Sequence, residues 1–305
     1  MAYFLGIDGG GTKTRCLLAD ETTVLATSMT GGCSVIRQGE EQAREALHTA
    51  ICQVCATAKV SPDRIRAICV GVTGAARPEI AAKIRSIVAE LIPGAALTKI
   101  EIVGDTLIAL EAAFGAAAGI ITIAGTGSIA YGRSAAGSTA RAGGWGFAIS
   151  DEGSGLWIGR RAIGALLRAH DQGLQSTLGG MIFQAWRISS IDELVQQANS
   201  TPPPDFPRLF AAVLKAASDG DTVAGDLLTE AGTKLADLVA IVIRRLASDA
   251  TGNIPPVATT GSVFRQSPDV RRVFYNRLRA DFPGIDVRQD IADPVDGALA
   301  RARRM

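Results

Sequence analysis

A glycine-rich turn near the start of the chain, residues 6–14 (GIDGGGTKT), constrains the fold more than any other stretch. The apolar runs on either side of it, residues 3–5 and 16–19, are each short enough to be a strand. A P-loop and a dinucleotide-binding fingerprint both lead into a helix and need a different glycine spacing, so this stretch fits neither. The sequence therefore predicts a strand, a tight turn and a second strand. Backbone N–H groups of such a turn can approach a phosphate, because no Cβ stands in the way.

The same arrangement recurs over residues 120–131, where a Gly-Thr-Gly turn again lies between two apolar strands. Two such turns, one in each half of the chain, indicate a duplicated fold that holds a polyphosphate from both sides. Ala124 in the second copy stands where the first has Asp8, whose carboxylate at the end of a strand can hold Mg²⁺ through water molecules. An ordinary glycine-rich hairpin is the alternative for the glycines alone.

Taken together and in order, these motifs resemble those of the sugar kinase, Hsp70 and actin superfamily. Residues 7–14 are similar to its first phosphate motif and residues 124–128 to its second. The Gly-Gly-Trp-Gly sequence at 143–146, followed by SDEGSG at 150–155, narrows the resemblance to the N-acetylglucosamine and glucosamine kinases. Their relatives are the BadF- and BadG-type ATPases, which activate benzoyl-CoA reductase and 2-hydroxyacyl-CoA dehydratases. The resemblance implies an α/β, two-domain actin-like ATPase (ribonuclease H-like) fold with a ligand cleft between the domains, and ATP and Mg²⁺ as cofactors.

The order of the expected elements predicts two α/β domains, residues 1–118 and 119–291. The first contains a three-stranded meander followed by alternating helices and strands, ending in a helix over residues 106–118. The second begins with two strands and then contains a helical insertion over about 155–247. Breaks in that insertion are expected near Gly173, Gly179, Ser189 and the prolines at 202–204. A terminal helix within 292–305 is expected to pack back on the first domain.

Asp105 follows a buried strand and begins a helix, where an aspartate is either a helix cap or a functional group. As a general base it would accept the proton of a sugar hydroxyl while that oxygen attacks the γ-phosphorus of ATP. The resemblance favours this role, because the family's catalytic aspartate matches the Gly104-Asp105 pair. The residues expected to bind the nucleotide are Asp8, which also holds the metal, Gly9, Gly10, Gly11, Thr12, Lys13, Gly125, Thr126, Gly127, Ser128, and, by resemblance to an adenosine motif, Gly261 and Ser262. A strand-to-helix turn is the alternative for the last two.

Trp145 lies among glycines that would let its indole lie against a sugar ring, although a core tryptophan is the alternative. The resemblance assigns Asp151 to the sugar and leaves Glu152 open, since a Ser-Asp-Glu sequence before a helix is also simple capping. The residues expected to bind the acceptor are Ser34, Asp105, Gly144, Trp145 and Asp151.

Two positions depart from the family pattern and leave the acceptor open. N-acetylglucosamine kinases commonly carry Asn at the position of Ser34, and some carry another at the position of Ile129. Without those amides, hydrogen bonds to the sugar or to an acetamido group are lost. Glucosamine, a related amino sugar or a non-sugar acceptor therefore remains possible.

Composition excludes several classes of function. With 31 basic and 30 acidic residues the net charge is +1, which gives no field to attract nucleic acid or an anionic membrane. Neither histidine, His48 or His170, lies by a motif, which argues against a Ser-His-Asp hydrolase. Three late arginines are expected to form a solvated helix end: Arg301, Arg303 and Arg304.

The chain contains five cysteines, an odd number, with one C-x-x-C formed by Cys52 and Cys55. No second half of a zinc site accompanies this pair, so we expect both thiols to pack as buried side chains of a helix over residues 40–59. The cysteine pattern implies no disulfide framework, and the first residues lack a basic segment typical of a secretion signal. A cytoplasmic location is the expectation.

The sequence thus favours an ATP-dependent kinase that phosphorylates N-acetylglucosamine or glucosamine, with the 6-hydroxyl as acceptor by resemblance. The alternative is a BadF-type ATPase that activates a partner reductase or dehydratase, but those relatives share a [4Fe–4S] cluster between subunits, and the cysteines here do not match that pattern. A regulatory sugar sensor without catalysis is disfavoured by the presence of Asp8 and Asp105. The expected partners are small molecules, the sugar and ATP, and a homodimer is left open.

Overall fold

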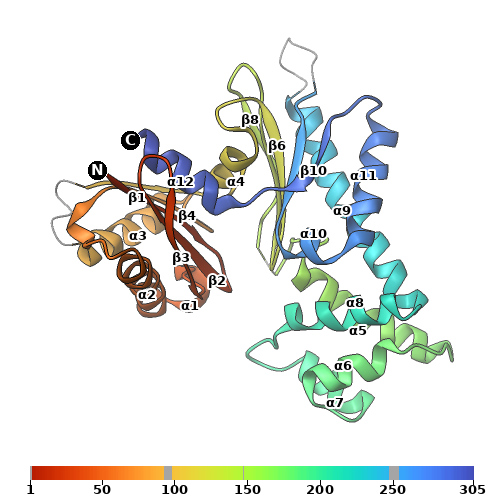
Figure 1. Ribbon diagram of the computed structural model, residues 1–305. Coiled ribbons are helices and arrows are strands. Elements are labelled where there is room, and N and C mark those ends of the chain that lie inside the picture. Colours follow the sequence, from red (N-terminus) through yellow and green to blue (C-terminus); the bar gives the residue numbers. More distant parts are fainter. Residues whose placement is uncertain (1, 93–97, 147, 247–253) are drawn as a thin grey trace. The chain divides into compact units, whose positions relative to one another are not determined.

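The structure is a computed structural model that describes residues 2–92, 98–146, 148–246 and 254–305 (Figure 1). It divides into two compact units, the first formed by Met1–Ile121 with Ala292–Met305 and the second by Thr122–Ile291. Within the described residues, each unit is built around a five-stranded sheet. No helix in these ranges is both long enough and apolar enough to span a membrane.

The sheet of the first unit has the strand order β3-β2-β1-β4-β5. Its strands are β1 (Tyr3–Gly9), β2 (Lys13–Ala19), β3 (Val24–Gly31), β4 (Ile65–Val72) and β5 (Lys99–Val103). The first three form the antiparallel meander that the sequence predicts, and β1, β4 and β5 run parallel. Because parallel strands end at the same edge of a sheet, β1, β4 and β5 bring their carboxyl ends together.

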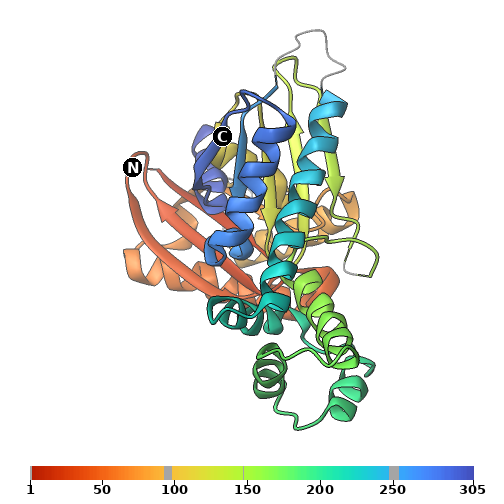
Figure 2. The same cartoon turned by 90° about the vertical axis from the view of Figure 1, so that its right-hand side faces the viewer.

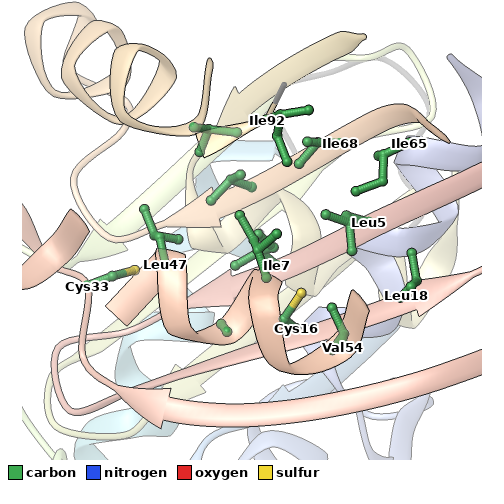
Figure 3. Close-up of a cluster of buried hydrophobic side chains, with 14 of the residues drawn as sticks. Leu5, Ile7, Cys16, Leu18, Cys33, Leu47, Val54, Ile65, Ile68 and Ile92 are labelled. Atoms are coloured by element: carbon green, nitrogen blue, oxygen red, sulfur yellow. The ribbon is translucent and has the colours of Figure 1, made fainter. Parts of the chain in front are cut away.

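Helices cover both faces of this sheet, which is why β1 and β4 are apolar nearly throughout. The helices are α1 (Val35–Gln38), α2 (Glu40–Ala58), α3 (Pro78–Leu91), α4 (Asp105–Phe114) and α12 (Pro294–Arg304), with a 3₁₀ turn η1 (Pro62–Arg64). Alternate side chains of β1 point to opposite faces, so Leu5 and Ile7 pack with Leu47 and Val54 of α2 (Figure 3). Phe4 joins a second cluster with residues of α4 and α12 on the other face.

Three expectations for the first unit are corrected by the structure. The helix expected over residues 106–118 begins at Asp105 and ends at Phe114, because Gly115 follows with a positive φ of 56°, which a glycine adopts without strain. The thiol of Cys55 is buried as expected, but Cys52 is exposed. It lies on the outer face of α2, where its Sγ is 3.3 Å from His48 Nε2.

The third correction concerns the arginines of the terminal helix, which are not a solvated helix end. Arg301 Nε donates to Glu101 at 3.0 Å, and Arg304 contacts the buried carboxylate of Glu111 at 2.8 Å. Arg303 donates to a backbone carbonyl of the loop after β2. These contacts hold α12 on α4 and on the sheet, and they explain why the cations lie here.

The sheet of the second unit has the strand order β10-β9-β6-β7-β8. Its strands are β6 (Gly119–Ala124), β7 (Ser128–Arg133), β8 (Thr139–Gly143), β9 (Val257–Thr260) and β10 (Val287–Ile291). Its helices are α5 (Gly155–Asp171), α6 (Leu178–Trp186), α7 (Ile191–Ala198), α8 (Leu209–Ser218), α9 (Thr222–Leu246), α10 (Ser262–Gln266) and α11 (Pro268–Asp281), with a 3₁₀ turn η3 (Phe206–Arg208). In Figure 2 the long helix α9, in cyan, runs along the sheet beside α11, in blue.

The helical insertion differs from the sequence expectation at two points. Gly179 lies inside the first turn of α6 and does not break a helix. An unexpected break falls between α8 and α9, where Gly220 has a φ of 91°. The carboxylate of Asp221 accepts hydrogen bonds there from Ser176 Oγ at 2.8 Å and Thr177 N at 2.6 Å. It thereby ties the start of α9 to the segment before α6.

Candidate functional site

Two aspartates lie at the carboxyl edge of the first sheet. Asp8 is the second-last residue of β1, and Asp105 follows β5 as the first residue of α4, with Gly104 as the N-cap. Thr73, directly after β4, donates from Oγ1 to Asp105 Oδ2 at 2.8 Å. The N–H of Thr106 donates to Asp105 Oδ1 at 2.9 Å. Both oxygens of Asp105 are therefore oriented by the protein.

Burial makes both carboxylates resist ionisation. Burial first, and then the charges of Asp105 and Asp293, raise the pKa of Asp8 from 3.8 to about 7, against the opposing effect of Lys13 and Arg15. Burial also raises the pKa of Asp105, which the two hydrogen bonds just described oppose. Shifts of this kind concentrate at functional sites, and here they mark a place where a cation would be stabilised.

The glycine turn between β1 and β2 is held by its carbonyl groups. Each of its three glycines accepts a hydrogen bond from the rest of the unit: Gly9 O from Thr73 N (3.3 Å), Gly10 O from Cys33 N (3.2 Å), and Gly11 O from Gln38 Nε2 (2.6 Å). Within the part of the chain that the structure describes, the N–H groups of Gly11 and Thr12 donate to no acceptor. The turn thus presents amides rather than carbonyls to a ligand, the polarity that an anionic phosphate oxygen requires.

Close packing explains why Gly9 carries no side chain. A Cβ added there would lie 2.4 Å from Cys33 Sγ, well inside contact distance.

Lys13, the first residue of β2, has an exposed side chain. Ser34 is 1% exposed and precedes α1, with its N–H donating to Gln38 Oε1 at 3.0 Å. Through Gln38, the residue predicted to bind the acceptor is thus linked to the turn predicted to bind phosphate.

The second turn, residues 125–128, is held by the start of α5. Gly155 N donates to Gly125 O at 2.8 Å, and Leu156 N donates to Thr126 O at 3.3 Å. Gly261, just before Ser262 and α10, has a φ of 107°, and a Cβ there would lie 2.2 Å from Ala124 O. The structure therefore brings the predicted adenosine motif against the strand that leads into this turn.

The side chain of Asp151 lies against the second turn. Its side chain is buried, its φ is 74°, and Oδ1 accepts a hydrogen bond from Ser128 N at 3.1 Å. The same oxygen would lie 2.9 Å from a Cβ added to Gly127. Glu152 contacts the turn through its backbone carbonyl, which accepts from Ser128 Oγ at 2.7 Å, whereas its carboxylate accepts from Ser150 Oγ at 3.1 Å. The residue predicted to bind the sugar thus contacts the second phosphate turn, which the sequence did not indicate.

Trp145 is 65% exposed and is not a core residue. The guanidinium of Arg141 lies 3.9 Å from the centre of its indole, a cation–π contact that covers one face of the ring. Gly144 has a φ of 69°, and a Cβ there would lie 2.6 Å from Ile129 Cδ1. Ile129, Gly144 and Trp145 are therefore neighbours on the second unit.

A cavity of about 240 Å³ opens on the second unit at the start of α5. Its lining includes Ser150 and Glu152 from the loop before α5 and Trp157 and Arg160 from the helix itself. It contains both a carboxylate and a guanidinium, which suits a polar ligand.

Several residues around the predicted positions, in the first unit and in the second, could not all be found from the sequence. Thr73 could have been found, because it follows a parallel strand as Asp105 does. The role of Gln38 had no such signal, since its partners Ser34 and Gly11 are brought to it only by the fold. Arg141 likewise becomes adjacent to Trp145 only through the end of β8.

The chain is similar in sequence and in structure to known sugar kinases and to an ATPase family. The family model described as the BadF/BadG/BcrA/BcrD ATPase family matches residues 5–300. An N-acetylmuramic acid/N-acetylglucosamine kinase of Clostridium acetobutylicum is 32% identical over 99% of both chains. An N-acetyl-D-glucosamine kinase of Dictyostelium discoideum is 29% identical over 98% of this chain and 97% of its own. The crystal structure of a candidate N-acetylglucosamine kinase from Chromobacterium violaceum aligns with a TM-score of 0.78, at 28% identity and 98% coverage of each chain. The predicted α/β fold class and the resemblance on which it rested are confirmed.

Proposed function

The chain belongs to the BadF/BadG/BcrA/BcrD ATPase family, and from that premise we propose that it is an ATP-dependent kinase that phosphorylates an amino sugar, with Asp105 as general base. N-acetylglucosamine and glucosamine are the proposed acceptors, and the 6-hydroxyl is the proposed acceptor oxygen. Relatives that cover the full length of the chain and are named as sugar kinases support the class of reaction.

One observation carries the proposal: the carboxylate of Asp105 is oriented by Thr73 at the same sheet edge as Asp8 and the glycine turn. A general base must be held in one orientation and must remain able to accept a proton. The hydrogen bond from Thr73 holds Asp105 in one orientation, and the raised pKa of Asp105 supports its ability to accept a proton. Phosphoryl transfer otherwise needs positioning and charge stabilisation, which a turn of amides supplies.

Each group has a defined task in the proposed reaction. The N–H groups of Gly11 and Thr12 bind phosphate oxygens and keep the γ-phosphorus in place. Asp105 accepts the proton of the acceptor hydroxyl as the hydroxyl oxygen attacks the γ-phosphorus. The bond between the γ-phosphorus and ADP breaks, and ADP is the leaving group. Trp145 offers the indole face that Arg141 leaves open, against which a sugar ring can stack.

Magnesium fits the residues present. Asp8 is a hard oxygen donor whose ionised form is disfavoured by burial and by Asp105 and Asp293, so a divalent cation beside it would relieve that cost. When bound, Mg²⁺ would neutralise charge on the phosphates. Asp8 is the residue that would hold it, through water.

The test is an assay of ADP release with Mg-ATP and N-acetylglucosamine, glucosamine, N-acetylmuramic acid, glucose or no sugar. We expect ADP release to depend on an amino sugar, and Asp105→Asn to lower kcat at least about 100-fold, the size of a general-base contribution. Asp63→Asn, at an exposed position of η1, is the matched control and should keep full activity. Sugar-independent turnover would instead favour the ATPase that activates a partner protein. An Asp105→Asn variant with near-normal kcat would remove this residue from the base role.

A further inference from the structure

The short helix α1 places a cation on the glycine turn. A Cβ added to Gly11 would lie 3.0 Å from Arg37 Nη1 and 3.1 Å from Arg37 Cδ. The guanidinium of Arg37 therefore lies beside Gly11, whose N–H group donates to no acceptor within the described residues. No feature of the sequence motif indicates this contact, because Arg37 lies 26 positions beyond Gly11 in the chain.

Arg37 has no partner of its own among the residues that the structure describes. Its side chain is exposed and enters no ion pair, side-chain hydrogen bond or cation–π contact there. Arg44, on the next helix, shows the usual alternative, since it pairs with Glu90 at 2.6 Å. A guanidinium next to a turn of amides and without a carboxylate suits an anionic ligand, because Arg binds phosphate oxygens through paired N–H groups.

The neighbouring residue fixes where Arg37 can lie. Gln38 joins Ser34 N to Gly11 O through its two amide atoms, at 3.0 Å and 2.6 Å. Gly32 leaves the room for this, since a Cβ there would lie 2.3 Å from Gln38 Nε2. The backbone at Arg37 is thus tied to the turn, and only its long side chain is free to adjust.

We propose that Arg37 is a further nucleotide-binding residue, whose guanidinium contacts the polyphosphate of ATP or ADP on the glycine turn. This inference rests on the nucleotide-binding part of the proposed function and not on the identity of the acceptor. Arg37 binds phosphate in addition to the amides of Gly11 and Thr12. Lys13, whose charge the motif made the obvious candidate, is then not the sole cation at the turn.

Calorimetric titration of the whole protein with ATP, ADP and adenosine, without sugar, tests the proposal. We expect Arg37→Gln to weaken ATP and ADP binding about tenfold, the size of one charge-assisted hydrogen bond, and adenosine binding by less than about twofold. Arg37→Lys should recover part of the loss, and the salt dependence of ATP binding should be smaller in Arg37→Gln than in the parent. Arg85→Gln, at an exposed position of α3, is the matched control and should bind all three as the parent does.

Two outcomes would overturn the proposal. Unchanged ATP affinity in Arg37→Gln would show that the guanidinium only covers the turn. If Arg37→Gln weakened adenosine binding as much as ATP binding, the substitution would have disturbed the whole nucleotide site. A lowered Tm of the variant would identify that disturbance as structural. Because no sugar is present, these outcomes are independent of whether an amino sugar is the acceptor.

Discussion

Replacing Asp8 with Asn should stabilise the ligand-free protein above neutral pH. Burial, Asp105 and Asp293 raise the pKa of Asp8 to about 7 in the folded state, against 3.8 for an ordinary aspartate. The folded state therefore binds a proton more tightly than the unfolded chain does. A group of this kind favours folding below its unfolded pKa, and that contribution is lost as the pH rises from about 4 to about 7. Asn is neutral at every pH, so the variant has no such contribution that is lost as the pH rises.

The magnitude follows from the size of the shift. One pKa unit corresponds to about 1.4 kcal/mol, so a shift of roughly three units would cost the ionised folded state about 4 kcal/mol. The Asp8 side chain keeps partial access to solvent and is coupled to Asp105, both of which reduce the effect. We therefore expect Asp8→Asn to raise the free energy of unfolding by ~2 kcal/mol at pH 8, and by less than ~1 kcal/mol at pH 5.

Urea unfolding without Mg²⁺ at the two pH values measures this difference. All three tryptophans, Trp145, Trp157 and Trp186, belong to the second unit. Fluorescence therefore reports that unit, whereas far-ultraviolet circular dichroism reports both, so the two probes locate the effect. Asp63→Asn serves as the control, because it removes an exposed carboxylate from the same unit.

A gain in stability that is the same at pH 5 and pH 8 would refute the reasoning, since titration of Asp8 could not then be its cause. Addition of Mg²⁺ provides a second check. Because the cation relieves the cost of the ionised carboxylate, it should raise the stability of the parent at pH 8 more than that of Asp8→Asn.

Two further variants test other contacts. Thr73→Val removes the hydrogen bond that lowers the pKa of Asp105, so we expect about a tenfold lower kcat and an acidic limb of the pH–rate profile moved to higher pH; an unmoved limb would contradict this role. Gly261→Ala should destabilise the second unit by about 3 kcal/mol, measured by fluorescence-detected urea unfolding, because it combines a clash with Ala124 O and a positive φ. Gly137→Ala, at a position with φ of 87° and open space around it, measures the cost of the positive φ alone and should lower the free energy of unfolding by about 1 kcal/mol. If both variants lost the same free energy of unfolding, the clash at Gly261 would be excluded as a cause.

Much of the fold could be predicted because local signals agreed with the final structure. Helix starts are one case: a proline occupies the first position of α3, α11 and α12, where its fixed φ suits the beginning of a helix. The two strand–turn–strand segments are another, since glycine clusters between short apolar runs allow few other conformations. The expectation failed at Gly179, where a buried glycine packs near Leu166 of α5 within a helix, a tertiary cause that no local signal shows.

The site was harder to predict because its interactions join distant segments. Asp105 was found through its motif, but its orientation comes from Thr73, which is 32 positions away and reaches it only because β4 and β5 are parallel. Asp151 was assigned to the sugar alone, and its contact with Ser128 depends on the left-handed backbone at Asp151 itself. The arginines of α12 looked like a solvated helix end, because Glu101 and Glu111 lie about 200 positions earlier.

The surface of the second unit bears on how selective the proposed acceptor site can be. Ile129 occupies a position where some N-acetylglucosamine kinases carry an amide, and it packs against Gly144 instead of offering a hydrogen bond. A site that hydrogen-bonds a substituent rejects an analogue without it strongly, whereas apolar packing discriminates only about 10- to 200-fold. In the proposed acceptor site, Trp145, with Arg141 on one face of its indole, would add a flat ring surface that discriminates little between sugars. On this surface alone, selection among amino sugars would therefore be weak.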